Sequence, residues 1–128
     1  MLAFLDHCVP DSVADVFRTY GHEVVLLREW LPTDSPDPLV AAVSENEGAV
    51  LVTVDGDYRK HVAPRIPIGA RARFRKLSHI RLECPEPQAA RRLEAAMSFI
   101  EAERGIALAS ADKRMIIGIG VAVLRTYR

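Results

Sequence analysis

Four aspartates stand where carboxylates from distant parts of the chain could meet. Asp6 ends the apolar run LAFL, and Asp55 and Asp57 follow the apolar run AVLVTV. Asp37 stands in the segment SPD, which is typical of a first helical turn. Carboxylates that approach one another repel unless a cation is present, and hard oxygen ligands suit Mg²⁺ or Mn²⁺. Such a cation can position water and a phosphodiester for in-line attack, so all four aspartates are candidate metal ligands and catalytic residues.

Each of these aspartates also has an ordinary structural explanation. Asp6 could cap the helix that follows it or make an Asx turn, and the helix dipole alone favours Asp37 in a first turn. The sequence Asp55-Gly56-Asp57 is a common turn. The case for a site therefore depends on whether the fold brings the four carboxylates to one place.

The segments around the aspartates alternate between strand-like and helix-like patterns. Apolar runs predict strands at residues 2–6, 23–27 and 49–54. Between the first two, apolar residues recur at helical spacing, with Pro10 suited to a first turn and Gly21 to a C-terminal stop. The apolar face of this helix is formed by Val13, Val16, Phe17 and Tyr20.

A second helix is predicted between the second and third strands. Ser35 is expected as its N-cap, with Pro36 and Asp37 in the first turn. The helix should run to about Glu47 and stop at Gly48.

Strands that alternate with helices imply a parallel sheet with right-handed crossovers. We expect a three-layer α/β sandwich with strand order 2-1-3 at its core and later strands beside strand 3. Ligands bind such sheets beyond the carboxyl ends of the strands, and neighbouring strands lie ~4.8 Å apart. Asp6 and Asp55 should therefore face each other across this crevice, with Asp57 in the adjoining turn and Asp37 at the same edge.

The rest of the chain continues the same architecture. Residues 78–84 predict a fourth strand, and residues 86–105 predict a helix rich in Ala, Leu and Glu. Residues 114–128 predict β structure that bends at Gly118 or Gly120. No repeat or linker interrupts the sequence, so residues 1–128 are expected to form a single domain.

Charge is distributed unevenly along the chain. Residues 1–58 carry eleven acidic and two basic side chains, whereas residues 59–76 carry seven basic and no acidic ones. A basic segment directly after the carboxylates could hold the backbone of a polyanion, although a solvated loop would have the same composition. The residues expected to contact nucleic-acid phosphates are Arg59, Lys60, Arg71, Arg73 and Arg75.

Composition excludes several other classes of protein. Hydrophobic residues make up 49% of the chain, but no apolar run approaches the ~20 residues that span a membrane. The N-terminus lacks the basic start of a signal peptide. Cys8 and Cys84 are far apart, which favours reduced thiols in a cytoplasmic protein over a disulfide framework. The four histidines show no ligand spacing and are interpreted as surface or core residues.

The first 60 residues resemble a known family. The segments FLDHCVPDSVADVFRTYGHEVVLL, DSPDPLVAAV and GAVLVTVDGDYRK follow the pattern of the short PIN-like domains, which are related to PIN nucleases. In that family a strand ending in Asp precedes a helix headed by Pro, and a later strand ends in T-x-D-x-D-[FY]. Every landmark occurs here in order, and the strand HIRLEC with its helix also fits. Where many relatives have a second acidic residue after the first Asp, this sequence has His7.

The resemblance implies a Mg²⁺-dependent ribonuclease of bacterial PIN-like type, often the toxin of a toxin–antitoxin pair. It implies that Asp6, Asp37, Asp55 and Asp57 hold Mg²⁺ or Mn²⁺. The partners it implies are an RNA substrate and an antitoxin protein, with a homodimer left open and no membrane involved.

Two alternatives remain open from the sequence. One is a non-catalytic interaction module whose acidic edge receives the basic tail of an antitoxin. The other is a phospho-receiver domain, which has a similar length and an aspartate after strand 3. Receivers need a full helix before their fourth strand, and the segment after Asp57 leaves about two turns broken by a proline.

Overall fold

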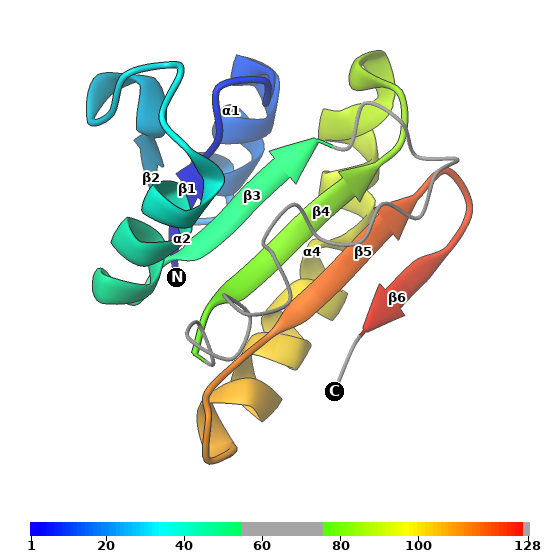
Figure 1. The fold of residues 1–128 in the computed structure, drawn as a ribbon. Coiled ribbons are helices and arrows are strands. Elements are labelled where there is room, and N and C mark those ends of the chain that lie inside the picture. Colours follow the sequence, from blue (N-terminus) through cyan, green and yellow to red (C-terminus); the bar gives the residue numbers. More distant parts are fainter. Residues whose placement is uncertain (55–75, 127–128) are drawn as a thin grey trace.

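The computed structural model describes residues 1–54 and 76–126, which form one sheet with helices on both faces (Figure 1). The strands are β1 (Leu2–Leu5), β2 (Glu23–Leu26), β3 (Val50–Val54), β4 (Ser78–Glu83), β5 (Ile116–Gly120) and β6 (Leu124–Thr126). The helices are α1 (Asp11–Thr19), α2 (Asp37–Asn46) and α4 (Glu86–Ala109), with a 3₁₀ turn η1 (Leu27–Glu29).

The strand order in this sheet is β2-β1-β3-β4-β5-β6. The first five strands are parallel, and only β6 runs antiparallel to its neighbour β5. The expected order 2-1-3 with later strands beside strand 3 is confirmed, and so is the mainly parallel α/β architecture. Parallel strands bring their carboxyl ends to one edge of the sheet, which is where Asp6 follows β1.

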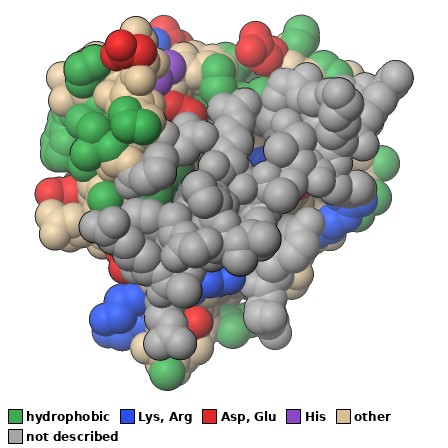
Figure 2. Space-filling view, viewed as in Figure 1, with side chains coloured by type: hydrophobic (Ala, Val, Ile, Leu, Met, Phe, Trp, Pro, Cys, Tyr) green, Lys and Arg blue, Asp and Glu red, His purple; other side chains and the backbone are tan. Residues whose placement is uncertain are grey.

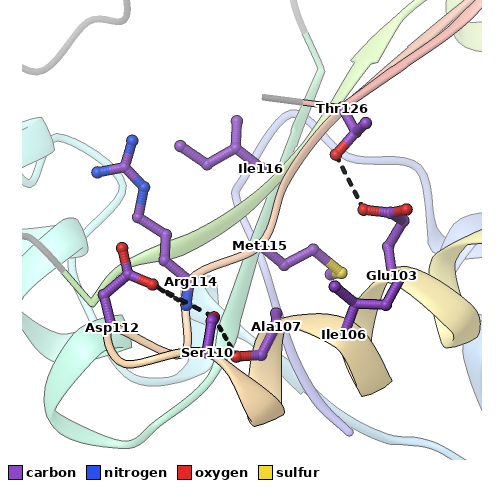
Figure 3. A pocket seen from close by; sticks show the side chains of 9 residues that line it. All are labelled: Glu103, Ile106, Ala107, Ser110, Asp112, Arg114, Met115, Ile116 and Thr126. Carbon is purple, nitrogen blue, oxygen red and sulfur yellow. Dashed lines mark hydrogen bonds between the residues drawn. The ribbon is translucent and has the colours of Figure 1, made fainter. Parts of the chain in front are cut away.

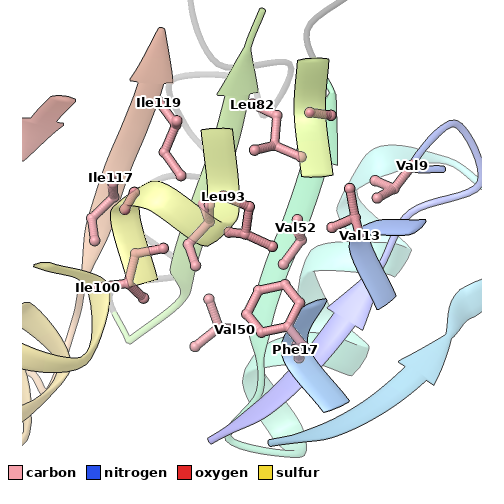
Figure 4. Close-up of a cluster of buried hydrophobic side chains, with 14 of the residues drawn as sticks. Val9, Val13, Phe17, Val50, Val52, Leu82, Leu93, Ile100, Ile117 and Ile119 are labelled. Atoms are coloured by element: carbon pink, nitrogen blue, oxygen red, sulfur yellow. The ribbon is translucent and has the colours of Figure 1, made fainter. Parts of the chain in front are cut away.

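One face of the sheet is covered by α1 and α4, and the larger core cluster lies there. Leu93 and Ile100 of α4 and Phe17 of α1 are fully buried against side chains of the strands (Figure 4). Val52 and Ile117 project from the sheet into the same cluster. In a strand alternate side chains point to opposite faces, so every second strand residue belongs to this core.

The opposite face is covered at β1 and β3 by α2 (Figure 1). Phe4 and Leu51 are buried there against Val40 and Ala41 of α2 and Leu27 of η1. Both faces of β3 are therefore covered in this region, which explains why its sequence is a continuous apolar run rather than an alternating one.

Element boundaries differ from the prediction at two helices. Pro36, not Ser35, is the N-cap of α2, and the Ser35 hydroxyl instead donates to the Pro32 carbonyl at 2.6 Å. The helix α4 continues through Gly105 to Ala109. Gly105 is exposed and helical, and a buried Ala107 in the next turn anchors the continuing helix to the core. Tyr20, expected on the apolar face of α1, follows the helix and is 42% exposed.

The C-terminal β structure turns after Gly120 and not at Gly118. The Gly120 N–H donates to the Val123 carbonyl at 2.8 Å, which closes the turn between β5 and β6. Gly118 lies in the middle of β5 and pairs with β4 on one side and β6 on the other.

Of the basic segment 59–76, Lys76 is described, and the remainder lies outside the described residues.

Two leucines of α4, one buried and one exposed, allow a matched test of how this helix packs on the core. Replacing Leu93 by Ala should lower the free energy of unfolding by about 2–5 kcal/mol, because the side chain is 0% exposed in the core cluster. The matched control is Leu108→Ala in the same helix, where the side chain is 52% exposed and the change should stay within about 0.5 kcal/mol. Urea unfolding followed by circular dichroism measures both. Equal losses in the two variants would contradict the packing of α4 described above.

Candidate metal centre

Asp6 continues the β1–β3 ladder by one residue. Its N–H donates to the Val52 carbonyl at 3.0 Å, directly after the paired residues Leu5 and Val52. Leu5 points into the core beneath α1 and α4, so alternation assigns Asp6 to the opposite face. By the same register Asp6 lies beside Thr53, at the carboxyl edge of the sheet.

Asp6 does not cap the helix that follows it. The N-cap of α1 is Pro10, and no side chain caps that helix. The half-buried Asp6 carboxylate instead accepts the His7 N–H at Oδ1, at 2.8 Å, while its carbonyl accepts the Val9 N–H at 3.0 Å. The capping explanation for Asp6 is therefore wrong, and the carboxylate is held by its own turn.

The turn after β1 also contacts the end of β3. Cys8 is exposed, and its thiol lies 3.8 Å from the carbonyl of Val54, the last residue of β3. Asp55 is the next residue in the sequence. The turn that carries Asp6 is thus held next to the residue from which Asp55 and Asp57 follow.

The remaining predicted site residues fall beyond what can be described. Asp37 is the first residue of α2. The chain enters α2 from β2, which ends at the carboxyl edge, so the N-terminus of α2 lies at the same edge as Asp6. The Asp37 side chain itself lies outside the described residues. The other two aspartates and the predicted RNA-contacting residues also lie outside the described residues: Asp55, Asp57, Arg59, Lys60, Arg71, Arg73 and Arg75. Within residues 1–54 and 76–126, no three His, Cys, Asp or Glu side chains form a cluster able to hold a metal.

His7 is the residue at this edge whose surroundings the sequence did not predict. Both ring nitrogens are buried, and neither has a hydrogen-bond partner among the residues that the structure describes. A buried polar group without a partner costs about 1–3 kcal/mol, so such groups mark places where an ion or water is expected. His7 adjoins Asp6 in the sequence and its backbone N–H donates to Asp6 Oδ1. Carboxylate and imidazole are both ligands of divalent ions, and Mn²⁺ accepts imidazole more readily than Mg²⁺ does.

A second polar contact joins β3 and β4 on the Asp6 side of the sheet. The Thr53 hydroxyl and His79 Nε2 lie 2.8 Å apart, and Arg81 follows two residues later on the same face. Burial, and to a smaller extent the positive charge of Arg81, lower the pKa of His79 from 6.5 to about 4. His79, which is half-buried, is therefore neutral at pH 7.

A cavity of about 340 Å³ lies at the other edge of the sheet, where β5 begins and α4 ends (Figure 3). The Thr126 hydroxyl donates to the Glu103 carboxylate at 3.0 Å on one side of it, and Ser110 donates to the Ala107 carbonyl on the other. Ligands of parallel sheets bind at the carboxyl edge, so this cavity is not part of the candidate metal centre.

One comparison with known proteins found a match, and it agrees with the fold. A family model described as a PIN like domain matches residues 1–72, which is more than half of the chain. No curated protein and no solved structure matches the chain significantly. Across the described part of the chain, no helix is long and apolar enough to cross a membrane.

The low pKa of His79 predicts a pH dependence of stability. The folded pKa of about 4 lies below the unfolded value near 6.5, so the unfolded chain takes up the proton first as pH falls. The free energy of unfolding should therefore decrease between pH 7 and pH 5, by up to about 2 kcal/mol from this residue. His79→Gln should lose that part of the slope in urea unfolding measured across this range. Parallel curves for wild type and variant would show that His79 titrates alike in both states.

The unpartnered nitrogens of His7 predict that an apolar replacement is tolerated. In chelator, His7→Leu should unfold at the same temperature as wild type or above it, because no hydrogen bond to another described residue is lost. With Mn²⁺ present, wild type should gain more thermal stability than the variant.

The matched control is His22→Leu. The His22 ring contacts the N-terminal amine at 2.9 Å and Glu101 Oε1 at 2.9 Å, so this variant should lose stability with and without metal. A loss in His7→Leu as large as that of His22→Leu in chelator would contradict the environment assigned to His7.

Proposed function

The chain belongs to the family of PIN-like domains, and on that premise we propose that it is a divalent-metal-dependent endoribonuclease acting as the toxin of a toxin–antitoxin pair. The observation that carries the proposal is the half-buried carboxylate of Asp6 at the carboxyl end of β1, where the central strands of the sheet meet. A phospho-receiver domain is not supported, because the family match is to PIN-like domains.

In the proposed reaction the aspartates act as one unit. Asp6 and Asp55 would hold the ion, Asp37 would help to fix its geometry, and Asp57 would bind a second ion or orient the first. When bound, Mg²⁺ or Mn²⁺ would supply a water of lowered pKa and polarisation of the phosphodiester. The turn from Asp6 to Val9 supplies rigidity, since the Val9 N–H donates to the Asp6 carbonyl and the His7 N–H donates to Asp6 Oδ1.

No covalent nucleophile is needed in this reaction, although a thiol lies close to Asp6. Cys8 is exposed and donates weakly to the Val54 carbonyl, a contact that links two segments of backbone. Its role in the proposal is structural. This separates the metal mechanism from a thiol mechanism in a single experiment.

Asp6→Asn and Asp55→Asn should each reduce cleavage of single-stranded RNA by several orders of magnitude, because ligands of one metal act as a unit. Cys8→Ala is the matched control and should keep its activity. Gel-resolved cleavage of a labelled RNA in Mg²⁺, with and without chelator, measures all three variants against wild type.

Cleavage that persists in chelator, or that Cys8→Ala abolishes while Asp6→Asn does not, would contradict the metal mechanism. A pure wild-type protein that binds Mn²⁺ in calorimetry and cuts no RNA would instead be a PIN-like interaction module. In that case the acidic edge would receive the basic tail of an antitoxin.

A further inference from the structure

Two arginines lie in one row across β4, β5 and β6. Arg81 of β4 pairs with Gly118 of β5, and Gly118 pairs with Arg125 of β6. Paired residues share a face of the sheet, and Arg81 is also paired with Thr53 of β3. Both guanidinium groups therefore belong to the face that carries Thr53, with a residue that has no side chain between them.

The carboxylate of Glu83 fills the space above Gly118. A Cβ on Gly118 would lie only 2.9 Å from Glu83 Oε1 and 3.2 Å from Glu83 Cδ. Glu83 Oε2 accepts from Arg125 Nη1 at 3.1 Å, and Oε1 lies 3.6 Å from Arg81 Nη1. The Glu83 side chain is 8% exposed. The missing side chain at Gly118 therefore leaves space for an anionic group between two cations, and we call this space the anion site.

The two arginines at this anion site offer more N–H donors and more positive charge than the Glu83 carboxylate uses. Each guanidinium has five N–H donors, and among the described residues Arg81 makes no hydrogen bond while Arg125 makes one. One arginine would neutralise one carboxylate, but here two surround it and leave a net positive charge. Arg125 is 43% exposed and Arg81 20%, so the donors are accessible from the surface.

The row leads directly to the candidate metal centre. Extending the β1–β3 register by one residue sets Asp6 beside Thr53, which pairs with Arg81. At ~4.8 Å per strand, Arg81 lies two strands and about 10 Å from Asp6, and Arg125 lies four strands and about 19 Å away. Figure 2 shows basic side chains on the side of the molecule where β5 and β6 lie.

We propose that Arg81 and Arg125 form a phosphate-binding site for single-stranded RNA, in which the Glu83 carboxylate occupies the place of a phosphate and competes with it. The proposal rests on the proposed function for the identity of the polyanion as RNA. Bidentate guanidinium donors suit phosphate oxygens, and the row would hold the chain beyond the residues near the metal. Glu83 keeps both arginines extended over Gly118 while no RNA is bound.

The test compares Glu83→Gln, which leaves Arg81 and Arg125 without their carboxylate partner, with a triple variant that removes all three charges. Removing the arginines alone would strand the Glu83 carboxylate, which can unfold the sheet. Glu83→Gln keeps both arginines and removes the competitor, and the triple variant with Arg81→Gln and Arg125→Gln added removes the site. Arg18→Gln, at the opposite edge where α1 ends, is the matched control for one lost charge.

Binding of a fluorescein-labelled oligouridylate is measured by anisotropy in chelator over a range of salt concentrations. Glu83→Gln should bind several-fold more tightly than wild type. The triple variant should bind more weakly than Glu83→Gln, with a salt slope smaller by about 1.4, which is about 0.7 for each lost phosphate contact. Arg18→Gln should match wild type. Melting temperatures establish that each variant is folded.

Equal salt slopes for Glu83→Gln and the triple variant would overturn the proposal, and so would a folded Glu83→Gln that binds no more tightly than wild type. Polyglutamate of equal length bound as tightly as RNA, with the same dependence on both arginines, would replace RNA by an acidic polypeptide and overturn the assignment. Because chelator removes the metal, these results do not depend on cleavage. A protein that cuts no RNA can still confirm the phosphate site, and an active nuclease can still lack it.

Discussion

Strand β1 lies between β2 and β3, and its burial on both faces fixes the geometry of the whole carboxyl edge. Ala3 and Leu5 pack beneath α1 and α4, while Phe4 packs beneath α2, and none of the three is more than 1% exposed. A shift of β1 by one residue would turn Ala3 and Leu5 towards α2 and Phe4 towards α1 and α4. Burial on both faces therefore specifies the register of β1 strongly. The position of Asp6 follows from this register, because its N–H makes the next hydrogen bond of the same ladder.

The sequence predicted the parts of the fold that burial controls. The apolar runs of β1 and β3 and the spacing of Val13 and Phe17 identified the central elements and their order 2-1-3. It did not predict the end of α4, because Gly105 is a stop signal by local propensity, whereas the burial of Ala107 in the next turn depends on tertiary packing. Nor did it predict the N-cap of α2, where the Ser35 hydroxyl bonds to a carbonyl of the preceding turn.

The candidate site was predictable to a similar extent. Asp6 could be placed from the end of an apolar strand, since alternation and the parallel edge are local and topological rules. The row from Thr53 to Arg125 could not be predicted, because it depends on the register between β3 and β4, and these strands are separated in the sequence by residues 55–77. One local signal was available: in β4, His79, Arg81 and Glu83 alternate with the buried Ile80 and Leu82, which indicates a polar second face.

Under the proposed function, the Asp6 end and the Arg125 end of the row across the sheet act on RNA phosphates with charges of opposite sign. A carboxylate edge without a cation repels the phosphates of RNA, and in a partly buried site unit charges 4 Å apart interact by about 4 kcal/mol rather than 1. The metal ion reverses that repulsion locally, but it can act only on the phosphate beside Asp6. Attraction farther along the chain has to come from fixed cations. Arg81 and Arg125 provide such charges without crowding the metal, because Arg81 lies two strands and Arg125 four strands from β1. Glu83 limits their net charge and keeps them extended, so the same sheet that aligns the carboxylate also orients the cations.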